Sequence, residues 1–155
     1  MAKLYFRYGT VGSAKTLNLL AVAHNYRSQE KKVLLIKPKI DDRFGQEQIK
    51  SRAGLEMNAD ILVDENTKLL KHNWDGISCI LVDEAQFLSA VHIEELRQLT
   101  VAENIPVICY GLRTDFRARL FEGSLRLMEL ADRIEEVKAT CHYCHSKSIM
   151  NLRHV

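Results

Sequence analysis

Four apolar runs rich in β-branched residues constrain the fold of this chain more than any other feature. They cover residues 31–38, 59–65, 76–84 and 105–112, and a shorter apolar and aromatic run covers residues 3–9. Each run is continuous, whereas a strand with one face in water alternates apolar and polar residues. Continuous runs are typical of parallel strands that are covered on both faces.

Helical periodicity separates these runs in three segments, residues 15–29, 91–104 and 123–134. The residues expected on the buried faces are Leu17, Leu20, Ala21 and His24 in the first segment, Ile93, Leu96 and Leu99 or Thr100 in the second, and Leu127, Leu130 and Ala131 in the third. We expect Ser124 to be the N-cap of the third helix. Strands and helices thus alternate, which predicts an α/β fold with a mostly parallel sheet and right-handed crossovers.

Two segments break this alternation. Residues 41–58 are polar and weakly periodic, and we expect a mobile loop there, helical in part. Residues 135–155 contain a strand pattern, a CxxC turn and an alternating strand pattern, as in a two-stranded zinc-ribbon hairpin. The predicted organisation is therefore a core over residues 1–137 and the first half of a small zinc-ribbon-like lobe over residues 138–155.

The composition fits one domain that binds a small polar ligand. The chain has 155 residues, 46% of them hydrophobic, and a formal net charge of +2. This balance gives no global attraction to nucleic acid or to an anionic membrane. No apolar run approaches the ~18 residues that cross a bilayer, and Lys3 and Arg7 interrupt any signal-peptide core, so we expect a cytoplasmic protein.

A phosphate-binding loop is indicated by the stretch YGTVGSAKT at residues 8–16, which nearly matches GxxxxGK[ST]. A glycine-bearing turn between a strand and a helix directs backbone N–H groups and the helix dipole at one point. Lys15 is expected to reach the β- and γ-phosphates of a nucleotide, and the Thr16 hydroxyl to bind Mg²⁺. The candidate nucleotide-binding residues here are Gly9, Gly12, Ser13, Ala14, Lys15 and Thr16. The alternative is an ordinary glycine-rich turn before an amphipathic helix.

Ala14 stands where the pattern has its second glycine. A positive φ at this residue would cost about 1 to 2 kcal/mol, whereas a negative φ would cost little. The charge-assisted contacts of Lys15 and Thr16 outweigh either cost. We therefore expect the loop to hold a nucleotide, with affinity lowered at most modestly.

Two carboxylates follow the apolar run at residues 76–82. Asp83 and Glu84 are expected at the carboxyl end of a strand, the edge where α/β sheets bind ligands. Asp83 fits the aspartate that holds Mg²⁺ through water, and Glu84 can accept the proton of an acceptor group. The alternative is that the pair begins a solvated loop or caps the next helix.

The segments IKPKIDDR, SRAGLE, ILVDEAQF, PVICYGLRTDF and FEGS, together with the phosphate loop and the CxxC, resemble type II thymidine kinases in order and spacing over the whole chain. The resemblance implies a RecA-like P-loop core with a zinc-bearing lobe, assembled as a homotetramer. It implies transfer of the ATP γ-phosphoryl group to the 5′-hydroxyl of thymidine or deoxyuridine, with Mg²⁺ as cofactor and structural Zn²⁺.

Matching motifs carry the family's site residues over to this sequence. Lys15 and Arg43 join Glu84, the general base, as catalytic residues, and Asp41 lies beside the transferring phosphoryl group. Asp41, Asp83 and Gln86 complete the candidate nucleotide-binding residues, and the resemblance places Gln86 and Phe87 beside the base-binding region. It assigns the pyrimidine pocket to Phe87, Leu112, Phe116 and Phe121. Without the family, residues 41–43 fit a solvated turn, and Phe121 fits a core residue equally well.

Two departures from the family pattern remain. Ala14 replaces a glycine. In the family a further stretch follows the hairpin, with a loop that grips the thymine and a second pair of zinc ligands. Cys141 and Cys144 supply two of the four ligands of a structural zinc site, so we expect a partly occupied site or a shortened chain. The alternative is that the CxxC forms an incidental turn with free thiols and binds no metal.

The leading interpretation is a deoxynucleoside kinase. A second is a nucleotide-binding module that has lost turnover, which Ala14 and the shortened end favour and Glu84 disfavours. A third makes the CxxC hairpin a nucleic-acid-binding zinc knuckle. The near-neutral charge and the lack of interleaved aromatic residues on the hairpin disfavour that reading.

Overall fold

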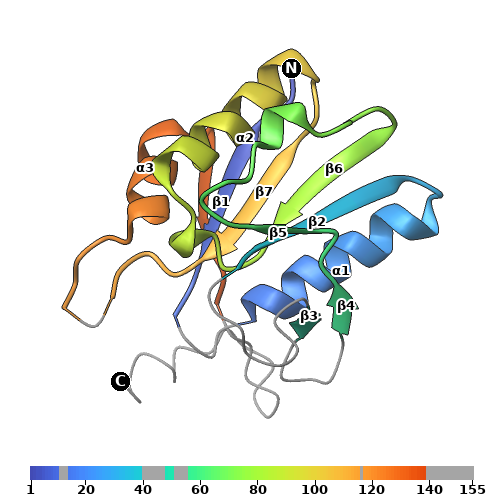
Figure 1. Cartoon of the computed structure of the whole chain (residues 1–155). Helices are drawn as coiled ribbons and strands as arrows, with labels where there is room; N and C mark the ends of the chain where they lie inside the picture. Colours follow the sequence, from blue (N-terminus) through green and yellow to red (C-terminus); the bar gives the residue numbers. More distant parts are fainter. Residues whose placement is uncertain (11–13, 40–47, 51–55, 116, 139–155) are drawn as a thin grey trace, which may run out of the picture.

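The computed structural model describes residues 1–10, 14–39, 48–50, 56–115 and 117–138. Its main sheet has the spatial order β5-β2-β6-β7-β1-β8, and neighbouring strands are parallel throughout (Figure 1). The strands are β1 (Leu4–Tyr8), β2 (Lys32–Pro38), β5 (Ile61–Val63), β6 (Ile77–Val82), β7 (Val107–Gly111) and β8 (Arg133–Glu136). The predicted parallel α/β sheet is confirmed.

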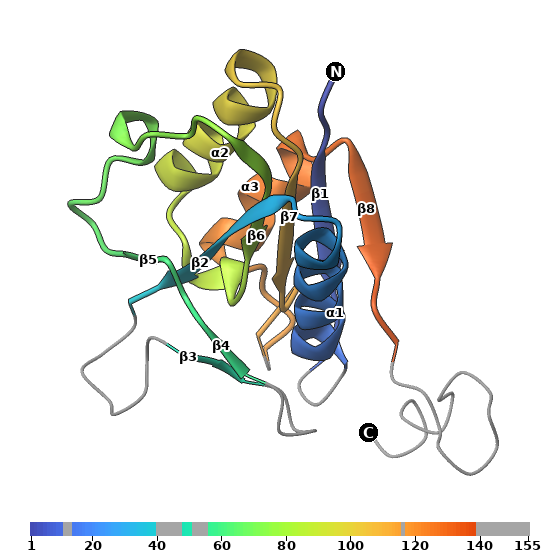
Figure 2. The same ribbon diagram turned by 90° about the vertical axis from the view of Figure 1, so that its right-hand side faces the viewer.

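Helices cover both faces of this sheet. Helix α1 (Lys15–Ser28) lies on one face, and α2 (Ala90–Ala102) and α3 (Glu122–Leu130) lie on the other (Figure 2). Successive side chains of a strand point to opposite faces. Accordingly, Val33 and Leu35 pack on the α1 side, and Leu34 and Ile36 pack on the α2 and α3 side. This double burial explains why the strand sequences are continuously apolar.

The buried face of α1 differs from the predicted one. Leu19, Leu20 and Ala23 are buried, whereas Leu17 is 38% exposed and Ala21 and His24 are exposed. Apolar residues occur on several sides of this helix, so its periodicity does not select one face, and packing against the sheet decides. In α2 the predicted set of Ile93, Leu96, Leu99 and Thr100 is buried, as expected.

The segment predicted as a third helix over residues 123–134 divides into a helix and a strand. The N-cap of α3 is Phe121, so the predicted cap at Ser124 is wrong. The buried Ser124 hydroxyl instead donates to the carbonyl of Leu112, a partner outside the helix. Leu127 is buried as predicted, and Leu130 and Ala131 pack partly buried against the core.

Strand β8 follows α3 directly and pairs with β1 in the main sheet. The sequence predicts a strand at the start of residues 135–155, as part of the CxxC hairpin. In the structure this strand is β8, which begins at Arg133 and belongs to the main sheet. Residues 139–155, which include Cys141 and Cys144, lie outside the described residues.

Residues 41–58 contain two strands rather than the predicted partly helical loop. Strand β3 (Gln48–Lys50) pairs antiparallel with β4 (Glu56–Asn58), and Ile49 lies opposite Met57. Ile49 is fully buried in the cluster that packs against α1. Each strand is three residues long and has one apolar residue, which is too short to produce an alternating pattern.

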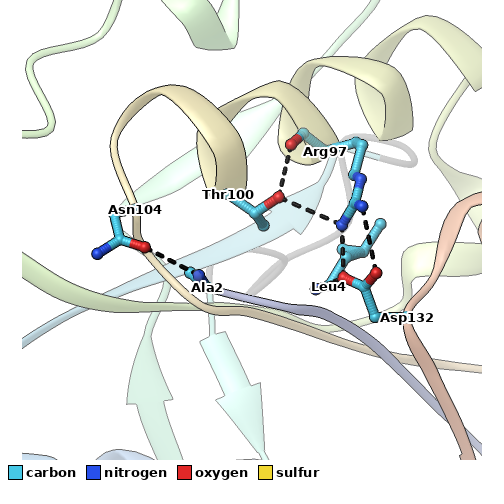
Figure 3. A network of polar contacts seen from close by, with 6 residues as sticks. All are labelled: Ala2, Leu4, Arg97, Thr100, Asn104 and Asp132. Carbon is cyan, nitrogen blue, oxygen red and sulfur yellow. Dashed lines mark hydrogen bonds and ion pairs between the residues drawn. The ribbon is translucent and has the colours of Figure 1, made fainter.

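A polar network ties the amino end of the sheet together (Figure 3). The backbone N–H of Leu4 donates to Asp132 Oδ2 at 2.9 Å, and Arg97 of α2 binds both carboxylate oxygens of Asp132. Nearby, Ala2 N–H donates to Asn104 Oδ1 at 2.8 Å. The network joins the start of β1 to α2 and to the residue before β8.

Two 3₁₀ turns, η1 (Leu69–Lys71) and η2 (Ala85–Phe87), complete the described structure. Turn η2 follows β6 at the carboxyl edge of the sheet, opposite the network just described. Cys79 and Cys109 are buried, and burial raises the pKa of both thiols. Among the described helices, none combines the length and the apolar character that crossing a bilayer requires.

Candidate active site

The predicted phosphate-binding loop joins the end of β1 to the start of α1. The N–H of Gly9 donates to the carbonyl of Gly111 at 3.2 Å, which ties the loop to the carboxyl end of β7. Ala14 is the N-cap of α1 and has φ −84°. Because this φ is negative, Ala14 carries none of the free-energy cost that a left-handed conformation would impose. Gly12 and Ser13 lie outside the described residues.

Lys15 is the first residue of α1, and Thr16 follows in the first turn. The Lys15 ammonium donates to the carbonyl of Thr10 at 2.6 Å. Partial burial lowers the pKa of Lys15, and the charges of Glu84 and Asp83 act in the opposite direction. The loop lysine and the two carboxylates therefore lie close enough to interact electrostatically at one edge of the sheet.

Asp83 and Glu84 follow β6 directly, as predicted. Asp83 is 6% exposed, and its N–H donates to the carbonyl of Ile36 at 2.9 Å. Burial, with a smaller contribution from Glu84, raises the pKa of Asp83 to about 6. Such a buried carboxylate is costly without a cationic partner.

Glu84 adopts a left-handed conformation, with φ 54° and ψ 40°. This region costs a non-glycine residue about 1 to 2 kcal/mol, and such strain clusters at functional sites. The sharp turn lets η2 start immediately after the strand. It also brings the Glu84 carboxylate against the side chain of Gln86, two residues later.

The Gln86 side chain is 2% exposed and is hydrogen-bonded at both ends of its amide. Its Nε2 donates to Glu84 Oε2 at 2.6 Å, and its Oε1 accepts from the backbone N–H of Leu112 at 3.1 Å. Leu112 is the residue after β7. The side chain thus bridges the ends of two neighbouring strands.

Phe87 and Phe121 form an aromatic pair beside these groups. Their ring centroids are 5.5 Å apart in an edge-on arrangement, and Phe87 is 48% exposed. Phe121 and Leu112 are partly exposed and do not belong to the buried core. The alternative that Phe121 is only a core residue is therefore not supported. Phe116, the fourth residue of the predicted pyrimidine pocket, lies outside the described residues.

Two glycines that the sequence analysis did not select allow this packing. A Cβ on Gly111 would lie 2.5 Å from Gln86 Oε1, and a Cβ on Gly123 would lie 2.2 Å from the carbonyl oxygen of Ala85. Both glycines thus permit close approach to η2. A glycine ending an apolar strand run is a signal of this kind of contact.

Four further predicted site residues lie outside the described part of the chain. They are Asp41 and Arg43, which precede β3, and Cys141 and Cys144, which follow β8. Within residues 1–10, 14–39, 48–50, 56–115 and 117–138, no group of three or more His, Cys, Asp or Glu side chains could hold a metal ion. The zinc prediction therefore remains a prediction.

Comparison with known proteins identifies relatives over nearly the whole length. The family model described as thymidine kinase matches residues 2–155. A thymidine kinase of Lactiplantibacillus plantarum is 44% identical over 99% of this chain and 81% of its own length. Thymidine kinases of Chromobacterium violaceum and Xanthomonas axonopodis are 44% and 45% identical over 99% of this chain and 82% and 75% of their own lengths.

A solved structure of a Pif1 helicase from Candida albicans is also similar, with a TM-score of 0.54 and 13% sequence identity. The match covers 88% of this chain and 36% of the helicase. At this identity the likeness concerns the fold alone. The sequence relationships are much closer, and by them the chain belongs to the thymidine kinase family.

Proposed function

We propose that this chain is a thymidine kinase that transfers the γ-phosphoryl group of ATP to the 5′-hydroxyl of thymidine or deoxyuridine. The observation that carries the proposal is the gathering of Lys15, Asp83 and Glu84 at one sheet edge in a member of this family. Nucleotides bind at the carboxyl edge of parallel sheets, and a phosphate loop opens there.

In this proposal the phosphate loop binds the donor. Lys15 exchanges its contact with the Thr10 carbonyl for the β- and γ-phosphates. Thr16 and Asp83 would hold Mg²⁺, and their hydroxyl and carboxylate oxygens are the donor type that this ion prefers. Asp83 is buried and its pKa is raised, so a nearby cation would favour its ionised form. When bound, Mg²⁺ neutralises phosphate charge.

Glu84 is the proposed general base. Its carboxylate accepts the proton of the nucleoside 5′-hydroxyl as the hydroxyl oxygen forms a bond to the γ-phosphorus. The bond from that phosphorus to the β–γ bridging oxygen breaks, and ADP leaves with the electron pair. Asp41 and Arg43 remain proposed neighbours of the transferring group, on family resemblance.

The acceptor base is proposed to lie against the pair of Phe87 and Phe121, with Leu112 and Phe116 completing the pocket. The exposed face of Phe87 supports this, because an aromatic ring left open to solvent beside a catalytic group offers stacking to a planar base. Family resemblance further supports a homotetramer with structural Zn²⁺, which we propose to be cytoplasmic. The near-neutral net charge supports the lack of a nucleic-acid partner.

The competing proposal, a nucleotide-binding module without turnover, loses one support in the structure. It relied on damage to the phosphate loop by Ala14, but Ala14 has φ −84° and carries no left-handed strain. It also gives no reason for a glutamate in a costly conformation beside the buried aspartate.

The test is a kinase assay with labelled ATP, Mg²⁺ and a panel of nucleosides. We expect thymidine monophosphate from the parent chain. Glu84→Gln should lower kcat on the order of 10²- to 10⁴-fold, the usual contribution of a general base, and still bind ATP. Glu103→Gln, an exposed change after α2, is the matched control and should leave kcat unchanged.

Each outcome bears on a different part of the proposal. Equal turnover by the parent and Glu84→Gln would show that Glu84 is not the base. A parent chain that binds ATP but phosphorylates no nucleoside would favour the module without turnover.

A further inference from the structure

The buried amide of Gln86 is the most completely enclosed polar group beside the proposed base among the described residues. It is 2% exposed, and it contacts the base through one end and the segment after β7 through the other. A glutamine buried at this level needs partners for its amide, and both partners found here belong to the proposed active site.

The orientation of the Gln86 amide follows from its partners. A backbone N–H can only donate, so the side-chain oxygen must face Leu112. The NH₂ group therefore faces Glu84, whose oxygen must accept at this contact. Gln86 therefore presents a hydrogen-bond donor to one carboxylate oxygen of the proposed base.

The surroundings hold the amide in place. Gly111 leaves room for Oε1, because a Cβ there would lie 2.5 Å from that atom. Leu112 is held in turn by Ser124 of α3, whose hydroxyl donates to the Leu112 carbonyl. Gln86 is thus packed against Gly111 and hydrogen-bonded to Leu112, a residue that α3 holds in place.

We propose that Gln86 is a positioning residue for Glu84. Its Nε2–H fixes Oε2 and so sets the rotation of the carboxylate, and the other oxygen receives the proton of the acceptor hydroxyl. Through Leu112, the same amide keeps the base in register with the proposed pyrimidine pocket. The inference rests on the proposed role of Glu84.

Two substitutions of similar length separate positioning from a purely structural role. Gln86→Met removes both hydrogen bonds. Gln86→Glu retains an acceptor for Leu112 but replaces the donor with a second carboxylate facing Glu84. We expect both variants to lower kcat on the order of tenfold to a hundredfold, because small misplacements of a reacting group cost this much.

The KM for ATP should stay within about twofold of the parent value, because among the described residues the Gln86 side chain hydrogen-bonds to Glu84 and Leu112 and not to the phosphate loop. This expectation departs from the nucleotide-site role that the family resemblance gives Gln86. The control is Gln98→Met on the exposed face of α2, which should leave kcat and KM unchanged. If Gln86→Glu keeps the parent kcat, the contact with Leu112 is sufficient and the positioning role is wrong.

A double substitution separates this inference from the proposed function. In the Glu84→Gln background, Gln86→Met should cause no further loss of kcat, since a positioning residue acts only through the group it positions. An equal loss in both backgrounds would overturn the inference while leaving Glu84 as the base. Full activity of Glu84→Gln alone would instead overturn the proposed role of Glu84, and the positioning role with it.

Gly111→Ala tests the same geometry without altering either partner. The added methyl should displace the Gln86 carboxamide and lower kcat in the same range as Gln86→Met. Urea unfolding of each variant checks that it is folded. A folded Gly111→Ala chain with the parent kcat would contradict the inference.

Discussion

At the scale of single residues, the backbone of Ala14 decides how the phosphate loop tolerates its missing glycine. Its φ of −84° is within reach of any residue, so the extra methyl group introduces no backbone strain. The remaining question is whether that methyl group obstructs a bound phosphate.

We predict that Ala14→Gly changes the Kd for ATP by less than tenfold, because there is no left-handed strain to relieve. Tenfold corresponds to about 1.4 kcal/mol. Calorimetric titration with ATP measures the effect, and Lys15→Ala, which removes the ammonium proposed to bind phosphate, should weaken binding far more. A gain above tenfold for Ala14→Gly would mean that the methyl group blocks the phosphate.

Strain is found instead at Glu84, whose φ is 54°. The sequence predicted the carboxylate at this position but not its conformation. Nothing local marks a glutamate as left-handed, and no pattern in the sequence indicates the 3₁₀ turn η2 that begins at the next residue. The bridge from Gln86 to Leu112 was equally hidden, since it joins residues 26 positions apart.

At the scale of elements, η2 packs against the first turn of α3 through Gly123. A Cβ at this glycine would lie 2.2 Å from the Ala85 carbonyl oxygen and 2.9 Å from that of Leu88. These neighbours are backbone atoms, so they cannot rotate away as a side-chain end could. The contact therefore couples α3 to the turn that carries Gln86 and Phe87.

We predict that Gly123→Ala lowers the free energy of unfolding by about 1 to 3 kcal/mol, the usual cost of overpacking, and also lowers kcat. Gly76→Ala is the matched control: Gly76 has φ 78° and no atom within 4 Å of the place where a Cβ would stand, so it should lose stability alone. Urea unfolding and the kinase assay measure the two effects. Parent-like stability of Gly123→Ala would show that η2 and α3 separate easily.

The elements that the sequence predicted best are those buried on two sides. Strands β2, β6 and β7 contribute buried apolar residues to both faces, so their sequences are continuously apolar and easy to recognise. In β3 and β4 one buried residue, Ile49, carries most of the packing, and three residues cannot show a period. Strand β8 was predicted in part, but its sheet was not, because pairing with β1 depends on chain topology.

The sheet edge that carries the proposed catalytic residues was predictable for the same reason. Once parallel strands are identified, their carboxyl ends must share one edge, which places Asp83 and Glu84 beside the phosphate loop. The face of α1 was not predictable, because apolar residues such as Leu17 also occur on its exposed side.

At the scale of the whole molecule, Asp132 links β1 to α2 at the amino end of the sheet. The hydrogen bonds from Arg97, and to a lesser extent that from the Leu4 N–H, lower the pKa of Asp132. A carboxyl group whose pKa is lower in the folded chain stabilises it above the unfolded value, near 4, and loses this contribution as the pH falls through the folded value.

We predict that Asp132→Asn lowers the free energy of unfolding on the order of 1 kcal/mol at pH 7. The difference from the parent should shrink as the pH falls below about 4. Urea unfolding between pH 3 and pH 7 measures it, with the exposed change Asp75→Asn as control. A difference that is constant over this range would mean that the Asp132 charge makes no contribution.

The zinc proposal also concerns the whole molecule. We expect mass analysis of the native protein to detect zinc at less than one ion per chain, because Cys141 and Cys144 supply half of a structural ligand set. Cys141→Ser should remove it, and Cys79→Ser, at a buried thiol in the core, is the control. Zinc that persists in Cys141→Ser would place the ion elsewhere.

The position of β1 between β7 and β8 has a consequence for biosynthesis. Strand β1 is the first of the described strands to be synthesised, and it acquires both neighbours only after the last described strand has been made. Before β7 has been made, neither neighbour of β1 exists, whereas β2, β5 and β6 can already associate without it. We therefore expect nascent chains that end before residue 107 to bind no ATP, however complete their phosphate loop.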